Sequence, residues 1–600
     1  MQAQVQDRIL QLTQASAVAD VELIQPLWNH YGTLSRVRLR GGAHASVIVK
    51  HIKIPKRSAH PRGFASAISR QRKIESYQIE AHWYERYNHR LPDDTSTPAC
   101  LGALVEGDEL FLLLEDLVEL GFDQVLSEVS WREITLVLQW LARFHAQFMS
   151  TAPEGLWSCG AYWHLDTRPE ELSKIEGTRV HRFASLIDAR LKRSAFQTLI
   201  HGDAKLANFC FSSSHASVAA VDFQYVGRGC GVRDVAYFVG SCLSEAQCQA
   251  LEAEILEIYF IQLRDRLSFD IDADALEAEW RALYPVAWAD FQRFMLGWSP
   301  LHRKLTTYSD LLTERVIDEL RDELLSAARS ACLAAGTLIQ AHQGRVLRTS
   351  SKGFMSPAGD IVTEVDVQAQ KLILDHLAPT ISRYHLGVLA EEGAQDDSRL
   401  DRHAFWTIDP LDGTQYFVEG CEGYAISIAL VSQRGESLLG VVYDPVNHNL
   451  YQAVRGEGVS LNGAPLPKLP SVVDHTKPIQ WFADRSLRTH PLFDHYQEHF
   501  EVNFVGGAVM NTLRLLTEAR SCYVKTPKEE LGGGAIWDFA AVTLMLTEAH
   551  GSALCYDGSA LSMNRPECVL FNDVGLACTS SDLEYSEVSA KLEMLERSQR

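Results

Sequence analysis

The sequence predicts two mixed domains, an α+β domain at residues 1–315 followed by a layered α/β domain at residues 316–600. Its 600 residues exceed what one hydrophobic core usually organises, so at least two domains are expected. Hydrophobic residues make up 46% of the chain and charged residues 22%, which is the balance of an ordered protein rather than a disordered one. In the second half, predicted helices alternate with predicted strands, and this order favours stacked layers of helix and sheet.

The boundary between the two domains is placed near residue 316, because one set of patterns ends there and another begins. Neither an internal repeat nor a Gly/Ser-rich linker separates the halves. Apolar residues recur at helical spacing from Val316 through Leu320, Leu324 and Ala328. This spacing predicts the first amphipathic helix of the second domain, with its end near Gly336.

The predicted elements differ between the two halves. Strands and turns are predicted at residues 30–54 and 100–117, and helices at 125–150, 167–198 and 244–266. The first half is therefore expected to contain a lobe with a sheet, followed by a helical lobe. In the second half, β-rich runs predict strands at residues 405–408, 424–431 and 438–445.

Composition argues against several classes of partner. The formal net charge of -21 argues against a nucleic-acid polymer as ligand, because such surfaces neutralise phosphates with Lys and Arg. No signal-peptide pattern opens the sequence and no apolar run reaches the length of a membrane span, so a cytoplasmic protein with no membrane partner is expected. The 12 cysteines are scattered singly, which favours reduced thiols over disulfides or structural zinc.

The most informative run is WTIDPLDGTQYF at residues 406–417. A short β-rich strand is followed at once by Asp409 and Asp412, and two carboxylates within one turn can bridge two divalent cations. Gly413 allows a sharp turn, and the N–H groups of a following helical turn can bind phosphate. An isolated turn of this kind is more often structural. Three further runs with carboxylates accompany it, namely GDIVTEVD at 359–366, LAEEG at 389–393 and IWDFAAVTLMLTEAHG at 536–551.

Together with Lys352, these runs occur in the order and approximate spacing of the inositol monophosphatase superfamily, which includes the 3′(2′),5′-bisphosphate nucleotidases. The resemblance covers residues 316–600 and implies a layered αβαβα sugar-phosphatase fold that binds Mg²⁺. It also implies hydrolysis of a small phosphomonoester, such as an inositol phosphate, fructose bisphosphate or 3′-phosphoadenosine 5′-phosphate. Inhibition by lithium and a homodimer formed through this half are further expectations.

The resemblance also implies roles for individual residues around the metal. Thr414, with Asp366 behind it, would orient the attacking water. Gly413 and Thr414 would offer backbone N–H groups to the phosphate, and Glu392 would lie behind the ligands. The groups that would ligate the metal ions are Glu391, Asp409, the Leu411 carbonyl, Asp412 and Asp538.

The substrate side of this half is less fully determined by the sequence. Gly507 and Ala508 belong to a run, VGGAVMN, that resembles the substrate wall of the family, and Glu530 would bind a polyol or ribose hydroxyl. The stretch at 522–534 departs from the common spacing. Two interpretations therefore stay open for Lys525 and Lys528, which are contact with a second phosphate and a solvated loop of charges.

A second constellation lies in LIHGDAKLANFCF at residues 199–211, followed by VAAVDFQYVG at residues 218–227. Asp203 precedes Asn208 by five residues, and Asp222 then follows a β-rich strand. Such a set can supply a base for a substrate hydroxyl and two oxygen ligands for Mg²⁺ beside ATP.

This segment resembles the aminoglycoside phosphotransferase and choline kinase group, and its Asp-Phe-Gln is closest to the ecdysteroid-kinase-like branch. The resemblance implies an α+β protein-kinase-like fold over residues 1–315, with ATP as cofactor and a small alcohol as substrate. Asp203 would be the catalytic base, and Asn208 and Asp222 would be metal ligands. Asp234 would brace the catalytic loop.

The first lobe carries two more residues that match this group. SVIVK at residues 46–50 ends in Lys50, and a predicted helix at residues 72–87 carries Glu80. They correspond to the lysine that binds the ATP phosphates and its helix glutamate, although an ordinary surface ion pair is the alternative. The run LFLLLEDL at 110–117 resembles the strand that leads to the adenine-binding hinge.

These observations predict a bifunctional protein, in which a small-molecule kinase precedes a phosphatase that acts on a small phosphorylated polyol, sugar or nucleotide. The alternative is a first half that binds nucleotide without turnover and regulates the phosphatase. Asp203, Asn208 and Asp222 favour the kinase, because a binding module does not need a base for a hydroxyl.

Overall fold

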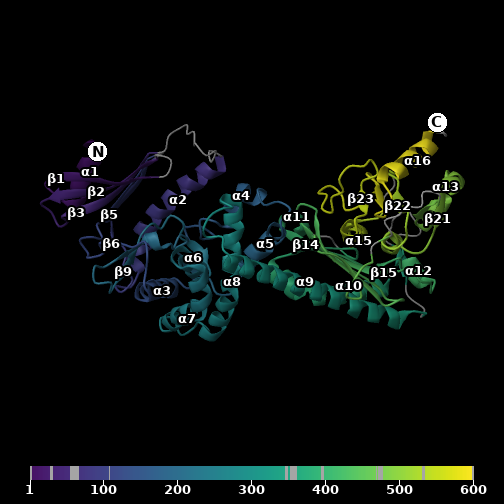
Figure 1. Cartoon of the computed structure of the whole chain (residues 1–600), viewed down its shortest axis with the longest axis horizontal. Helices are drawn as coiled ribbons and strands as arrows, with labels where there is room; N and C mark the ends of the chain where they lie inside the picture. The colour runs from purple at the N-terminus through teal and green to yellow at the C-terminus, as the bar shows by residue number, and fades with distance from the viewer. Residues whose placement is uncertain are drawn as a thin grey trace. The chain divides into compact units, whose positions relative to one another are not determined.

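The computed structural model shows two compact units, residues 1–317 (unit 1) and residues 318–600 (unit 2). Each unit has its own sheets and its own hydrophobic clusters. Figure 1 colours the chain from its N-terminus to its C-terminus. The structure describes residues 3–27, 31–53, 67–106, 109–344, 349–351, 361–393, 397–467, 469, 477–529 and 534–597.

Unit 1 begins with a five-stranded antiparallel sheet in the order β1-β2-β3-β5-β4. Val47 and Val49 alternate along β3 and join Phe111 and Leu113 of β5 in one apolar cluster. Lys50 follows Val49 and therefore points to the opposite face of the sheet, where it meets helix α2. The elements of this lobe are α1 (Ala3–Thr13), β1 (Ala17–Pro26), β2 (Gly32–Arg40), β3 (Ser46–Lys53), α2 (Ala67–Arg86), β4 (Cys100–Glu106) and β5 (Glu109–Glu115).

The rest of unit 1 is mainly helical. The predicted helix over residues 167–198 is interrupted, because the side chain of Thr178 accepts the N–H of His181 at 3.3 Å and starts a new helix there. The helices are α3 (Trp131–Gln147), α4 (Pro169–Ser173), α5 (Arg179–Lys192), α6 (Val232–Cys242), α7 (Glu245–Arg264) and α8 (Ala273–Trp298). The short strands are β6 (Gln124–Val125), β7 (Thr198–Ile200), β8 (Phe209–Phe211), β9 (Val218–Ala220) and β10 (Gly227–Gly229).

These short strands hold the loops that carry the predicted site residues of unit 1. Strand β7 pairs with β10, and β8 pairs with β6 and β9. Asp203 lies just after β7, Asn208 just before β8, and Asp222 just after β9. The three side chains therefore come from consecutive strand ends.

Unit 2 contains a seven-stranded sheet, β13-β14-β15-β16-β17-β18-β19, and a five-stranded sheet, β21-β20-β22-β24-β23. The strands of the first sheet are β13 (Gly387–Ala390), β14 (Ala404–Asp412), β15 (Ala425–Ser432), β16 (Ser437–Asp444), β17 (Asn449–Val454), β18 (Gly458–Leu461) and β19 (Ala464–Pro465). The second sheet is formed by β20 (Ile479–Phe482), β21 (Phe500–Asn503), β22 (Ser521–Lys525), β23 (Ser552–Leu554) and β24 (Leu576–Thr579). A separate hairpin pairs β11 (Thr349–Ser351) with β12 (Ile361–Thr363).

Helices and sheets of unit 2 alternate in layers (Figure 1). A Cβ on Gly336 of α9 would touch Tyr443 of β16, whereas Gly440 of β16 lies against Ala541 of α15. Gly440 and Tyr443 point to opposite faces of the sheet, so α9 and α15 cover opposite sides of it. The mixed α/β character predicted for this half is confirmed. The helices of unit 2 are α10 (Glu364–Tyr384), α11 (Ser398–Asp401), α12 (Thr414–Val418), α13 (Phe493–His499), α14 (Ala508–Arg514), α15 (Ile536–Glu548) and α16 (Tyr585–Arg597).

Helix α9 (Thr307–His342) begins earlier and ends later than the sequence predicts. Just before it, Thr306 and Ser309 exchange hydrogen bonds, in which the N–H of each reaches the hydroxyl of the other at 3.0 and 3.2 Å. The helix also continues through Gly336. A Cβ there would lie 2.4 Å from the ring of Tyr443, so a larger residue would not fit at this position. Gly336 is thus a packing glycine rather than a helix end.

Helix α9 is also long and apolar enough, by length and composition alone, to cross a membrane. This differs from the expectation from the sequence, which considered only uninterrupted apolar runs. Core helices of folded domains pass the same test, and α9 has a fully buried stripe that fits such a helix. The stripe is formed by Val316, Leu320, Leu324, Ala328, Cys332, Ala335 and Ile339.

Candidate active sites

Three carboxylates of unit 2 meet at the end of strand β14. Asp409 and Asp412 lie on this strand, and Asp538 lies in the first turn of α15. Oxygen atoms of the three side chains lie within 4.8 Å of one another, and Asp409 is only 1% exposed. The structure therefore brings together carboxylates that are 129 residues apart in the sequence at the extremes.

Backbone N–H groups hold two of these carboxylates in place. Asp412 accepts the N–H groups of Ala508 at 3.1 Å and Val509 at 3.0 Å. Asp538 accepts the N–H of Ala535 at 2.8 Å and so caps its own helix. The geometry shows that the predicted wall residue Ala508 supports Asp412 through its amide.

Asp409 is bonded at only one of its oxygens. Its Oδ1 accepts the N–H of Leu411 at 3.0 Å, whereas its buried Oδ2 has no hydrogen-bond partner among the residues that the structure describes. A buried carboxylate oxygen without a partner is costly unless a cation or water satisfies it. The donor set therefore fits a divalent cation with a preference for oxygen ligands, such as Mg²⁺.

The charges in this cluster oppose one another. Burial raises the pKa of Asp409 well above its usual value, and the charges of Glu391 and Asp538 add to the effect. Burial also raises the pKa of Asp412, again with a contribution from Asp538. A bound cation would reverse this effect, because it favours the ionised form of every carboxylate around it.

Glu391 approaches the cluster from the neighbouring strand. It follows β13, and its N–H donates to the carbonyl of Ile408 on β14 at 3.2 Å. Its charge raises the pKa of Asp409, which places the two carboxylates close to each other. The backbone of Glu392 is held instead by Gln370, whose Oε1 accepts the Glu392 N–H at 2.8 Å.

A hydroxyl and a further carboxylate lie beside the carboxylate cluster. Thr414 Oγ1 is 3.0 Å from Asp366 Oδ1 and 3.1 Å from the Leu411 carbonyl oxygen. Asp366 is fully buried and accepts the N–H of Thr363 at 2.9 Å, which fixes it at the start of α10. The structure thus brings the predicted pair Thr414 and Asp366 into hydrogen-bond contact.

Two glycines allow the chain to approach Asp412 closely. Gly413 has φ of 81°, and a Cβ there would lie 2.8 Å from the carbonyl oxygen of Gly423. A Cβ on Gly507 would lie 2.3 Å from Asp412 Oδ2, and the Gly507 N–H donates to the Gly423 carbonyl at 2.9 Å. Neither position can accept a side chain without moving the carboxylate or the backbone.

Sequence reasoning missed Asp484 and left Lys525 open. Lys525 shares a face of β22 with Tyr523, which packs toward α15, so its side chain reaches the carboxylates. Lys525 Nζ is 2.8 Å from Asp484 Oδ2, and Tyr523 donates to the same carboxylate at 3.1 Å. Lys525 is 15% exposed, so it does not belong to a solvated loop of charges. In the sequence, Asp484 comes two residues after the apolar run IQWF, much as Asp409 comes directly after FWTI, and this signal could have identified it.

Two residues that the sequence singled out lie outside the described residues. They are Glu530, predicted to bind a substrate hydroxyl, and Lys352, which contributed to the family resemblance. Lys528 lies inside them, and its N–H donates to the carbonyl of Asn572 at 2.7 Å.

Unit 1 brings together a lysine and two carboxylates from three different segments. Lys50 Nζ is 2.5 Å from Glu80 Oε2 and 3.4 Å from Asp222 Oδ1. Lys50 is 5% exposed and Glu80 is 2% exposed, so this is not an ordinary surface pair. Burial opposes the charge on Lys50, but Glu80 and Asp222 outweigh it and raise its pKa.

The remaining predicted residues of unit 1 surround Asp203. Asn208 Nδ2 donates to the Asp203 carbonyl at 2.8 Å and lies 3.2 Å from Asp203 Oδ2. Lys205 Nζ is 2.8 Å from the same Oδ2. Asp222 has φ of 69°, a strained value for this residue, and accepts a hydrogen bond from Gln224.

Asp234 holds the backbone of the loop that carries Asp203. It is fully buried, and its carboxylate accepts the N–H groups of His201 at 2.6 Å and Gly202 at 2.9 Å. The two amides directly precede Asp203, so Asp234 fixes the backbone from which that side chain projects.

A cavity of about 560 Å³ opens beside this constellation, and Asp203, Lys205 and Asp222 all line it. Sequence reasoning did not identify this cavity, because its walls come from segments that lie far apart in the chain.

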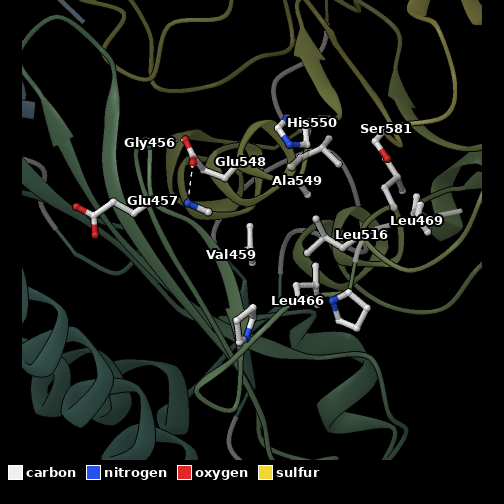
Figure 2. A pocket seen from close by; sticks show the side chains of 15 residues that line it. Gly456, Glu457, Val459, Leu466, Leu469, Leu516, Glu548, Ala549, His550 and Ser581 are labelled. Carbon is white, nitrogen blue, oxygen red and sulfur yellow. Dashed lines mark hydrogen bonds between the residues drawn. The ribbon is translucent and has the colours of Figure 1, made fainter. Parts of the chain in front are cut away.

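Unit 2 has a different hollow of about 480 Å³, shown in Figure 2. Val459, Leu466, Leu469 and Leu516 give it an apolar wall, and Glu548 binds the N–H of Gly456 at 2.8 Å at its rim. Among the described residues that line it, none belongs to the predicted metal or substrate set. It is therefore separate from the carboxylate cluster.

Comparisons with known proteins connect both constellations to families. Residues 320–593 match the model of the inositol monophosphatase family, and residues 157–269 match that of the ecdysteroid kinase-like family. An inositol-1-monophosphatase of Synechocystis is 30% identical over 248 residues, which are 40% of this chain and 81% of that protein. Its counterpart in Mesorhizobium japonicum is 30% identical over 260 residues, 42% of this chain and 93% of that protein.

Solved structures of such proteins also align with the chain. An IMPase of Thermotoga maritima has a TM-score of 0.38 and 23% identity, and the alignment covers 47% of this chain and 99% of that one.

Proposed function

Because the chain belongs to the inositol monophosphatase family, we propose that unit 2 hydrolyses a small phosphomonoester with bound Mg²⁺. One observation above all supports this proposal. Oxygens of Asp409, Asp412 and Asp538 lie within 4.8 Å of one another in a buried site. The substrate class is a phosphorylated polyol, sugar or nucleotide.

In this proposal, the residues of the chain have distinct tasks. Glu391, Asp409, the Leu411 carbonyl, Asp412 and Asp538 hold the metal. Mg²⁺, when bound, lowers the pKa of a water molecule and neutralises charge on the phosphate. Thr414 donates its proton to Asp366 and can then accept one from the attacking water, which orients the water's lone pair toward phosphorus. The N–H groups of Gly413 and Thr414 bind the phosphate oxygens.

A phosphate-release screen of the full chain tests this function. The substrates are inositol phosphates, sugar phosphates, histidinol phosphate and 3′-phosphoadenosine 5′-phosphate, each with Mg²⁺ and with a chelator. We expect release from one class with Mg²⁺ only, and its loss in Asp538→Asn. Release that persists at full rate in the chelator would contradict the proposal.

A second activity, phosphoryl transfer from ATP to a small alcohol, is supported by the arrangement in unit 1. Lys50 and Glu80 form a buried pair beside Asp222, and Asn208 lies within hydrogen-bond reach of Asp203. Asp203 takes the hydroxyl proton as the alcohol oxygen forms its bond to phosphorus and the bond to the ADP oxygen breaks. Asn208 and Asp222 hold the Mg²⁺ that accompanies ATP.

The competing proposal for unit 1 is a regulatory module that binds nucleotide without turnover. ADP formation from ATP in the presence of a panel of small alcohols separates the two. Alcohol-dependent ADP formation supports the kinase. Tight nucleotide binding that changes the phosphatase rate, with no ADP formed from any alcohol, would support the module instead.

A further inference from the structure

The walls of the cavity beside Asp203 are aromatic on one side. Trp298, at its edge, is 41% exposed, and its ring stacks on Phe294 with centroids 5.8 Å apart. Stacked rings that remain accessible can cover a flat or apolar part of a ligand. The aromatic residues that line the cavity are Tyr162, Tyr225, Tyr237, Phe294 and Trp298.

The charged residues of this cavity are mostly cations. Asp203 and Asp222 belong to the proposed transfer machinery, and Lys205 is paired with Asp203. The other charged residues that line it, among those described, are one carboxylate, Glu171, and four cations, namely Arg72, Lys73, Arg168 and Lys304. A cavity with this balance repels a cationic ligand and attracts an anionic one.

Two of the cations are guanidinium groups that the protein holds close together. Arg168 donates from Nε to the Tyr162 carbonyl at 2.7 Å, and Arg72 donates from Nη1 to the Thr167 carbonyl at 2.6 Å. Burial lowers the pKa of Arg72 to about 10, and repulsion from Arg168 adds to the effect. Such a pair is pre-organised for a ligand with two negative oxygens.

Glu171 neutralises only part of this charge. Its Oε1 is 3.3 Å from Arg168 Nη1, a long contact that involves one of the two guanidinium groups. Lys73 is bonded differently, because its Nζ donates to Gln224 Oε1 at 2.5 Å and so supports the residue that holds Asp222.

Lys304 is the most informative of the four. Its Nζ lies 4.3 Å from the ring centroid of Tyr237 and 5.4 Å from that of Phe291. In the part of the chain that the structure describes, this ammonium has no hydrogen-bond or salt-bridge partner. A half-buried ammonium that lines a cavity and is held over aromatic rings is available for an anion.

We propose that the alcohol phosphorylated in unit 1 carries an anionic group, a carboxylate or a phosphate, which binds Lys304 and the Arg72–Arg168 pair. An apolar or aromatic part of the same molecule lies against Tyr162, Phe294 and Trp298. This inference rests on the proposed kinase activity. It goes beyond that activity by excluding cationic and simple neutral alcohols as preferred substrates.

Binding of three matched probes to the full chain tests the inference. The probes are para-hydroxymethylbenzoate, benzyl alcohol and para-hydroxymethylbenzylamine, which differ in charge at one position. Calorimetry with ADP and Mg²⁺ present should give an affinity for the benzoate about tenfold or more above that for the neutral alcohol, since one buried charge contact of about 1.4 kcal/mol suffices. The amine should bind most weakly.

Two variants and a second anion sharpen the test. Lys304→Met should remove most of the preference for the benzoate, whereas Arg303→Met, which changes the exposed neighbouring residue, should keep it. Para-hydroxymethylphenyl phosphate, measured in the Asp409→Asn chain so that it is not hydrolysed, distinguishes a phosphate from a carboxylate site.

The outcomes separate this inference from the kinase proposal. Equal or weaker binding of both anions than of benzyl alcohol, including no binding of any probe, overturns the inference. It is also overturned if Lys304→Met weakens ATP binding and leaves probe binding unchanged, because the cation would then serve the nucleotide. A clear anion preference without ADP formation from any alcohol would instead overturn the kinase activity and leave an anion-binding site.

Discussion

In unit 2, burial and the charges of neighbouring carboxylates raise the pKa of Asp409 and Asp412, whereas in unit 1 lysines of the chain itself compensate the charge of Asp222. Burial opposes ionisation of Asp222, but Lys50 and Lys205 outweigh it and lower its pKa. The carboxylates of unit 2 therefore need a bound cation to ionise favourably. The charge of Asp222 in unit 1 is compensated before any ligand binds. Removing a carboxylate should therefore stabilise the metal-free site of unit 2, whereas removing Asp222 should weaken binding at the site of unit 1.

The largest effect is expected for Asp409→Asn. Loss of this ligand should lower phosphatase turnover about a thousandfold, the equivalent of about 4 kcal/mol of the stabilisation that a metal provides. At the same time, the metal-free protein should melt at a higher temperature, because a buried carboxylate whose ionisation is opposed by burial and by neighbouring charges is gone. Phosphate release, Mg²⁺ calorimetry and thermal melting in chelator measure the three quantities.

Asp557→Asn is the control for this prediction, because Asp557 lies in an exposed turn where its carboxylate bonds Ser559. It should leave Mg²⁺ affinity and turnover unchanged. A metal-free Asp409→Asn chain that melts earlier than the parent would show that the carboxylates do not oppose one another.

The next largest effect concerns the kinase activity proposed for unit 1. Asp203→Asn should reduce turnover about a hundredfold or more, since general-base help is worth 10²–10⁴-fold, and should leave the affinity for ATP·Mg²⁺ nearly unchanged. Asp222→Ala should weaken both, because Lys50 then keeps only Glu80 as partner. Initial rates and nucleotide titrations separate the two patterns. Identical losses in both variants would show that the two aspartates do not have separate roles.

A smaller effect, of opposite sign to a ligand mutation, is expected for Lys525→Met. Lys525 adds positive charge beside Asp484 and Asp538, and these carboxylates outweigh its burial and raise its pKa. Its removal should increase Mg²⁺ affinity about tenfold, a change of about 1.4 kcal/mol, and lower the melting temperature of the metal-free protein. Lys528→Met, three residues further on, is the matched control. Weaker Mg²⁺ binding in Lys525→Met would mean that the lysine positions a ligand rather than competing with the metal.

The smallest effect is a pH dependence of anion binding in unit 1. Burial lowers the pKa of Lys304 to about 8, opposed by Asp203 and Cys242 and assisted by Lys205 and Arg303. Lys304 is charged below this pH, so the affinity for para-hydroxymethylbenzoate should fall severalfold as the pH rises from about 7 to about 9. The affinity for benzyl alcohol should stay constant over this range. A benzoate affinity that rises with pH would contradict the sign.

Much of the fold of unit 2 could be predicted from its sequence. The strand predicted at 405–408 is part of β14, and those at 424–431 and 438–445 closely match β15 and β16. The prediction succeeded because buried strands give dense β-rich runs that end in recognisable turns. The prediction of one continuous helix over 167–198 in unit 1 was wrong, because Thr178 caps a new helix that apolar spacing alone does not reveal.

The parts of the two sites that could not be predicted from the sequence are those formed by contacts between distant segments. Asp484 and Lys525 are 41 residues apart in the chain and meet only because β20 and β22 pair in parallel. Arg72, Arg168 and Lys304 come from three separate segments, and the proposal that they bind one ligand rests on the cavity that they share. Charge accumulated across such distances leaves no local pattern.

The uninterrupted course of α9 determines where the gene can be cut. A chain that starts at Val316 would begin in mid-helix, where the first four N–H groups lose their acceptors, and it would lack the reciprocal bonds between Thr306 and Ser309. A fragment that starts a few residues before Thr306 keeps this cap, worth about 1 kcal/mol. Anyone who expresses the phosphatase half alone should therefore begin at the cap of the helix and not at the boundary between the compact units.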